Sequence, residues 1–148
     1  MPNQTSTAVH VGPSRIASLL ASSTEILYGL GLGERVVAVS HECDYPPQVG
    51  NKPRVTHTHV AAEASSGAID EQVKNITSSG GALYEIDVDQ LARLAPDLIV
   101  TQAQCDVCAV RYEDVMAAVQ QRPELRDTRV VALNPQTFSD ILEDVRRV

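Results

Sequence analysis

The chain has 148 residues, which is enough for one domain with a sizeable buried core. Its formal net charge of −7 argues against a nucleic-acid-binding surface, because such surfaces need clusters of lysine and arginine. No apolar run approaches the roughly 20 residues that cross a bilayer, so the sequence predicts no membrane span.

Residues 1–13 are small and polar, and we expect them to form a disordered leader. They lack the basic stretch and following apolar stretch of a signal peptide, so we expect the chain as it stands to be cytoplasmic. The three cysteines, few and odd in number, fit a reducing compartment better than a disulfide scaffold.

Apolar runs with strand character alternate with helical patterns along the rest of the chain. The first strand covers residues 15–20, and the helix after it has Ser22 and Glu25 at the spacing of a capping box. The later elements are predicted as a strand at 35–40, a short strand near 54–56, a helix at 68–79, a strand at 83–86, a helix capped by Asp87 and stopped by Pro96, strands at 98–101 and 129–133, a helix at 112–121 and a last helix from Phe138 to Val148.

This alternation predicts an α/β fold, a Rossmann-like three-layer lobe with a mostly parallel sheet over residues 14–136. The last helix, over residues 137–148, has an apolar stripe of Phe138, Ile141, Leu142 and Val145, and no glycine ends it. Such an ending indicates truncation or continuation into another segment, and simple fraying is the alternative.

Ligands gather at the carboxyl ends of the strands in open α/β sheets, and three loops leave those ends here: 21–24, 41–47 and 102–108. In the first loop, Ser22, Ser23 and Thr24 lie at the start of a helix. Free backbone N–H groups and hydroxyls there suit an anion or a polar ligand edge, and plain helix capping is the alternative.

The other two loops hold one imidazole and three thiols. His41 and Cys43 lie in the second loop, and Cys105 and Cys108 lie in the third. This is the ligand set of a Cys₃His zinc site, which suggests a cytoplasmic metal-binding or redox protein. The alternatives are small buried thiols, a redox pair, and a cysteine nucleophile at Cys43 beside His41.

Four stretches of the sequence carry a family resemblance. RIASLLASSTEILYGLGL at 15–32, RVVAVS at 35–40, DYPP at 44–47 and LARLAPDLIV at 91–100 resemble the opening of ABC-transporter periplasmic substrate-binding proteins of the vitamin B12 and ferric-siderophore type. HECDYP at 41–46 and CDVCAV at 105–110 resemble a cobalamin-binding-like branch of that family. The resemblance runs from about Arg15 to the end of the chain.

The resemblance implies two α/β lobes joined by one long helix, with a ligand held between them. This chain would be the N-terminal lobe and a truncated fragment, with 137–148 as the start of the inter-lobe helix. It would be non-catalytic and need no cofactor, and its partners would be a small-molecule ligand, cobalamin or an iron chelate, and an ABC permease. The family is usually periplasmic.

The resemblance also implies roles for individual residues. Ser22, Ser23, Tyr45 and Gln102 would contact the ligand, with the Tyr45 ring against a corrin or siderophore face. Asp89 would dock on arginines of the permease, and an acid favoured at a helix N-terminus is the alternative for this position. His41 and the cysteines have no counterpart in the ordinary family, so their role does not carry over.

Overall fold

The computed structural model describes residues 12–61 and 63–148, so the predicted leader at 1–13 lies almost wholly outside the described residues. The strands are β1 (Ile16–Ser18), β2 (Val36–Val39), β3 (Thr56–Thr58), β4 (Tyr84–Ile86), β5 (Leu98–Gln102) and β6 (Arg129–Leu133). The helices are α1 (Ala21–Gly29), α2 (Ser66–Ser78), α3 (Val88–Leu94), α4 (Tyr112–Gln121) and α5 (Phe138–Arg147), and short 3₁₀ turns cover Gly33–Arg35, Pro47–Asn51 and Pro123–Leu125.

Four strands form one parallel sheet in the order β2-β1-β5-β6. The remaining pair, β3 and β4, forms a separate antiparallel ribbon. Parallel neighbours need a crossover between them, and helices supply it here, as the alternating sequence pattern predicts. The prediction of an α/β fold with a mostly parallel sheet is therefore confirmed.

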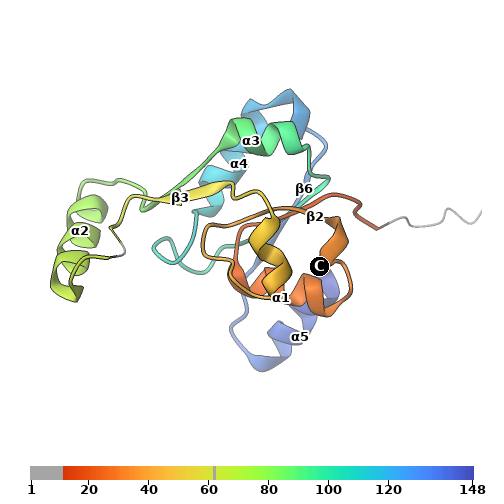
Figure 1. Cartoon of the computed structure of the whole chain (residues 1–148), viewed down its shortest axis with the longest axis horizontal. Coiled ribbons are helices and arrows are strands. Elements are labelled where there is room, and N and C mark those ends of the chain that lie inside the picture. The colour runs from red at the N-terminus through yellow and green to blue at the C-terminus, as the bar shows by residue number, and fades with distance from the viewer. Residues whose placement is uncertain (1–11, 62) are drawn as a thin grey trace, which may run out of the picture.

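Successive strand residues point to opposite faces of the sheet, and both sets of side chains are buried. Ile16, Leu98 and Val100 pack on one side with Leu27 of α1 and with Val148. Ala17 and Ile99 pack on the other side with residues of α3 and α4, such as Leu91 and Val115. The helices thus form a layer on each face, which gives the three-layer arrangement around the central strands (Figure 1).

The helix starts agree with the sequence prediction only in part. Asp87 caps α3 as predicted, its side chain accepting from Gln90 N–H. The capping box expected at Ser22 and Glu25 does not form, because α1 already begins at Ala21 and its N-cap is Leu20. A capping box that the sequence analysis missed, between Thr137 and Asp140, starts α5 instead.

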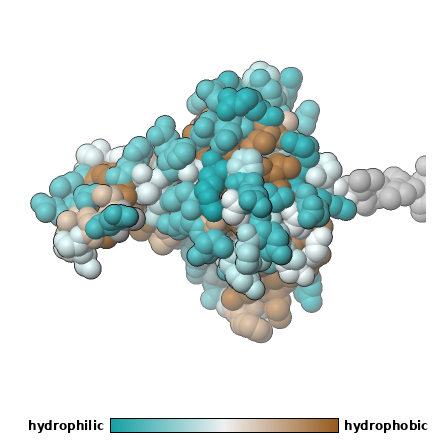
Figure 2. Space-filling view, in the orientation of Figure 1, coloured by the Kyte–Doolittle hydropathy of each residue, from teal (hydrophilic) through white to brown (hydrophobic). Residues whose placement is uncertain are grey.

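Two helices leave apolar residues uncovered. Helix α2 stands apart from the sheet, and none of its residues is buried (Figure 1). Helix α5 exposes Phe138, Ile141 and Leu142, and Figure 2 shows apolar surface over this helix. The role of 137–148 as the start of an inter-lobe helix stays a prediction. Among the described residues, no helix combines the length and the apolar character needed to cross a membrane.

Candidate functional site

The strand order reverses between β1 and β5, since β1 leads to β2 on one side and β5 leads to β6 on the other. In open α/β sheets such a reversal leaves a crevice at the carboxyl ends of the two strands. A cavity of about 210 Å³ lies there, and Leu20, Ser22 and Gln102 are among its lining residues. Two of the predicted ligand contacts, Ser22 and Gln102, therefore share one cavity at the expected edge.

Ser23 has a different place from its neighbour. It is fully buried, its hydroxyl lies 2.6 Å from Ser18 Oγ, and it donates to the Leu20 carbonyl at 2.8 Å. Thr24 Oγ1 donates to the same Ser18 oxygen at 2.7 Å. These bonds tie the start of α1 to the end of β1, so in this structure Ser23 supports the turn and Ser22 faces the cavity.

Gln102 also has a structural task. Its buried amide donates to the Cys105 carbonyl at 2.6 Å and accepts from the backbone N–H groups of Gln104 and Cys105, each at 2.7 Å. The amide nitrogen and the amide oxygen of Gln102 are both hydrogen-bonded within the loop after β5. Gln102 therefore shapes this loop and has little hydrogen-bonding capacity left for a ligand in the cavity.

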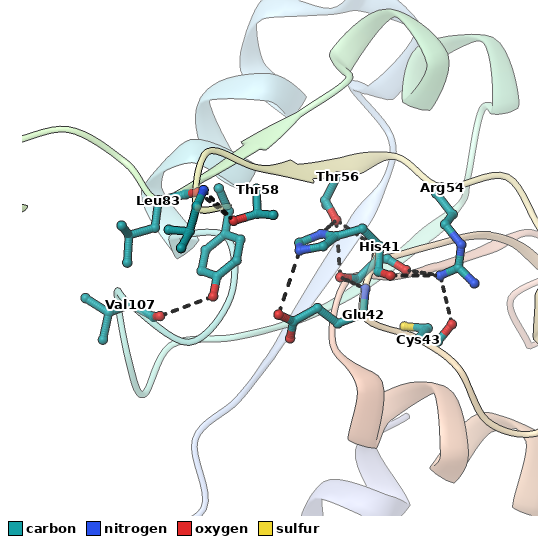
Figure 3. A network of polar contacts seen from close by, with 11 residues as sticks. His41, Glu42, Cys43, Arg54, Thr56, Thr58, Leu83 and Val107 are labelled. Carbon is teal, nitrogen blue, oxygen red and sulfur yellow. Dashed lines mark hydrogen bonds and ion pairs between the residues drawn. The ribbon is translucent and has the colours of Figure 1, made fainter. Parts of the chain in front are cut away.

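His41 lies in a polar network at the end of β2 (Figure 3). Thr56 Oγ1 donates to Ser40 Oγ at 3.1 Å, so it accepts from His41 Nδ1 at 2.7 Å, which assigns the proton to Nδ1. The ring packs 5.4 Å from that of Tyr84, and Nε2 lies 3.8 Å from a Glu42 carboxylate oxygen. Burial lowers the pKa of His41, and the nearby Glu42 carboxylate only partly opposes this.

Cys43 lies in the same loop as His41, and Arg54, which lies outside the loop, is hydrogen-bonded to the loop's backbone. The Cys43 thiol is buried 3.1 Å from Thr24 Oγ1, and burial raises its pKa. Arg54 Nη1 donates to the carbonyls of Ser40, His41 and Cys43 at 2.8 to 3.1 Å (Figure 3). A buried thiol with a raised pKa is a poor nucleophile, which disfavours an enzyme built on Cys43.

The structure does not assemble the predicted Cys₃His zinc site. Cys105 and Cys108 are joined in a disulfide, so neither sulfur is a free thiolate, and Cys43 is buried against Thr24. The described residues contain no group of three His, Cys, Asp or Glu side chains placed to hold a metal ion. The spacing of Cys105 and Cys108 favours pairing with each other, which departs from the expectation of a reducing compartment and leaves open the alternative of a redox pair.

Tyr45 and Asp89 lie on the surface. Tyr45 is 61% exposed in the loop after β2, and the bond from it to Pro46 is cis. Asp89 lies in the first turn of α3 with a side chain that is 64% exposed, and it forms an ion pair with Arg122. Both side chains are accessible, as the roles implied by the resemblance require.

The sequence analysis missed Asp144, which also lines the cavity at the strand reversal. Asp144 is only 5% exposed, whereas its helix exposes apolar residues such as Phe138, at 75%. The sequence signal available for Asp144 was its position three residues before Arg147, a spacing that allows an ion pair along a helix.

No family model matches this chain. The vitamin B12-binding protein of Vibrio cholerae serotype O1 is 51% identical over 43 residues, which are 29% of this chain and 16% of that protein. An ABC transporter substrate-binding lipoprotein of Bacillus subtilis is 43% identical over 51 residues, 34% of this chain and 16% of that protein. The matched parts thus cover about a sixth of each relative's length.

Solved structures match over a longer span. The periplasmic vitamin B12-binding protein of Vibrio cholerae has a TM-score of 0.57 and 26% identity, covering 89% of this chain and 38% of that one. A periplasmic heme-binding protein of Pseudomonas aeruginosa has a TM-score of 0.60 at 14% identity, covering 91% and 37%, and at that identity it shows the fold alone. The resemblance of this chain to ABC-transporter substrate-binding proteins, periplasmic vitamin B12-binding proteins among them, is therefore confirmed over a part of their length, and the ferric-siderophore part of the resemblance stays a prediction.

Proposed function

We propose that this chain is a non-catalytic ligand-binding lobe of an ABC-transporter substrate-binding protein, and that its ligand is cobalamin or an iron chelate. The observation that carries the proposal is the cavity at the strand reversal, lined by Ser22 and Gln102 on a fold shared with a vitamin B12-binding protein. In our proposal this lobe is the N-terminal one.

The surroundings of the cavity support a large ligand with an apolar face. At about 210 Å³ the cavity is too small for a whole corrinoid or heme, so such a ligand would lie across its mouth. Tyr45 offers an exposed aromatic ring at the end of the neighbouring strand β2. The proposed contacts are therefore Ser22 below the ligand and Tyr45 against its face.

Permease docking through Asp89 is the second part of the proposal. The Asp89 carboxylate is exposed and already pairs with an arginine of this chain, Arg122. An arginine of the permease would replace Arg122 in the same geometry, since bidentate pairing with a carboxylate is the usual arginine contact. Under this proposal the protein would work on the outer side of a membrane, as the resemblance implies, and not in the cytoplasm.

Calorimetric titration with cyanocobalamin, hemin and ferric desferrioxamine B tests the ligand. We expect saturable binding of at least one of them. Ser22→Arg should weaken it by at least about tenfold by filling the cavity mouth, which corresponds to about 1.4 kcal/mol. Leu30→Ala, at the other end of α1, is the matched control and should leave binding unchanged. Absence of heat with all three ligands, or equal binding by Ser22→Arg, would contradict the proposal.

A further inference from the structure

Helix α5 turns an aspartate inward. Asp144 is buried, while Ile141 and Leu142 of the same helix are exposed. Moving a carboxylate out of water costs free energy unless the carboxylate gains hydrogen-bond partners. A helix with several exposed apolar residues is therefore expected to bury those residues in preference to an aspartate. The inward position of Asp144 therefore calls for a partner on the inside of the helix.

Only half of the Asp144 carboxylate has such a partner. Oδ1 accepts from Arg147 Nη1 at 2.9 Å, whereas Oδ2 is buried without a hydrogen-bond partner among the described residues. A buried acceptor left unsatisfied costs the full free energy of its desolvation. Arg147 is 48% exposed, so water screens its charge and leaves the carboxylate attractive to a second cation.

The cavity at the strand reversal lies between α1 and α5. Asp144 lines it and is the only charged residue on its wall among the described residues. Leu20, Ile26 and Leu133 supply apolar wall around it. The cavity has an apolar wall and is lined by Asp144, whose unsatisfied carboxylate oxygen is covered in this structure. A rotation of that side chain would present the oxygen to a short alkyl group that ends in a cation with N–H donors. The net charge of −7 on the chain also favours the approach of a cation.

We propose that this cavity binds a primary alkylammonium group, which donates to Asp144 Oδ2 while its alkyl chain lies against Leu20, Ile26 and Leu133. The group has two sources: a free small amine, or an amine-bearing arm of the larger ligand that binds across the cavity mouth. Only the second source rests on the proposed function, because the cavity then forms one end of the same ligand site.

The first test uses small probes of equal length. Titration of the ¹⁵N-labelled protein with n-pentylammonium, followed by NMR, should shift the amide signals of Ser22, Ile26 and Asp144 in a saturable way. Pentan-1-ol has the same chain and no charge, and it should bind at least about tenfold more weakly, because charge-assisted hydrogen bonds are the stronger ones. Equal binding of the two probes, or no binding of pentylammonium together with a negative second test, would overturn the proposal.

The second test finds the source of the ammonium. Ferric desferrioxamine B carries a terminal primary amine, and its N-acetyl derivative does not. A preference for the amino form at least about tenfold in affinity shows the arm of a larger ligand in the cavity. A preference for pentylammonium over pentanol without this difference shows a free amine. Failure of cobalamin, hemin and both chelates to bind would remove the proposed function and leave the result with pentylammonium standing.

Two variants locate the preference. Asp144→Asn should bring the ratio of pentylammonium to pentanol affinity close to one, and Glu143→Gln should keep it. Glu143 makes the same kind of pair with Arg146 on the exposed side of the helix, so it controls for the loss of one helix ion pair. A preference retained in Asp144→Asn would overturn the assignment. The ratio in the parent protein does not depend on the folding of any variant.

Discussion

The carboxyl edge of the sheet contains two polar regions, and each has one buried side-chain atom without a hydrogen-bond partner among the described residues, His41 Nε2 in one and Asp144 Oδ2 in the other. The regions differ in how far the surrounding groups are bonded. In the His41 loop, residues 40–45, Arg54 donates to three backbone carbonyls and Thr56 bonds His41. In the cavity between α1 and α5, Asp144 Oδ2 has no partner among the described residues. The residues that stand out in the sequence thus hold the protein together, and a less conspicuous aspartate faces the cavity.

A substitution of Arg54, which supports the His41 loop and not the cavity, is expected to cause the largest loss of stability. Arg54→Met removes the donor that joins the carbonyls of Ser40, His41 and Cys43. Hydrogen bonds to a charged group contribute about 1.5–3 kcal/mol, so we expect a loss of about 3 kcal/mol in the free energy of unfolding. Urea denaturation measures it. Arg126→Met, at an exposed position, is the control. A variant as stable as the parent would show that the loop does not depend on Arg54.

A smaller loss of stability, with a clearer effect on binding, is expected at Gln102. Gln102→Leu removes the amide that holds the loop at Cys105, and water reaches the freed backbone groups because this loop is partly exposed. We expect the free energy of unfolding to fall by about 1 kcal/mol and ligand binding to weaken. Gln120→Leu, exposed on α4, should change neither quantity. Unchanged binding in Gln102→Leu would mean that the loop does not shape the site.

The smallest effect concerns pH and His41. Its folded pKa lies below the ordinary value of 6.5 because of burial, so the unfolded chain binds the proton more readily. Stability should therefore be lost as the pH falls below about 6.5 and through the folded pKa. Thermal unfolding between pH 7.5 and 5 should show this slope in the parent and a flatter one in His41→Gln. In His57→Gln the slope should shrink only slightly, since burial is the larger cause. Parallel slopes in the parent and His41→Gln would refute the assignment.

The parallel sheet was predictable because each of its four strands lies in a short apolar run, whereas β3 is a polar strand that lies at Thr56–Thr58, beyond the strand predicted near 54–56. Leu98, Ile99 and Val100, for example, are apolar on both faces of the sheet and are fully buried in β5. Helix α2 was also predicted, with Ile69 and Val73 on one face. That none of its residues is buried against the described part of the chain was not predictable, because a stripe of apolar residues does not say what covers it.

The candidate site was predictable only in part, for a physical reason. The loops at the strand ends follow from the order of strands and helices, so Ser22 and Gln102 were placed at the correct edge. The inward turn of Asp144 depends on the tertiary position of α5, which lines one cavity together with residues of α1. The separation of Cys43 from Cys105 and Cys108 likewise depends on tertiary distances that the residue types do not encode.

The central claim, that the edge at the strand reversal binds the ligand, is tested most directly by amide hydrogen exchange. The protein is compared alone and with saturating cyanocobalamin, hemin or ferric desferrioxamine B. We predict that at least one ligand slows exchange at residues 20–24 and 102–105, which flank the cavity. Exchange that is unchanged with all three ligands, or slowed only in α2 and the β3–β4 ribbon, would contradict the claim.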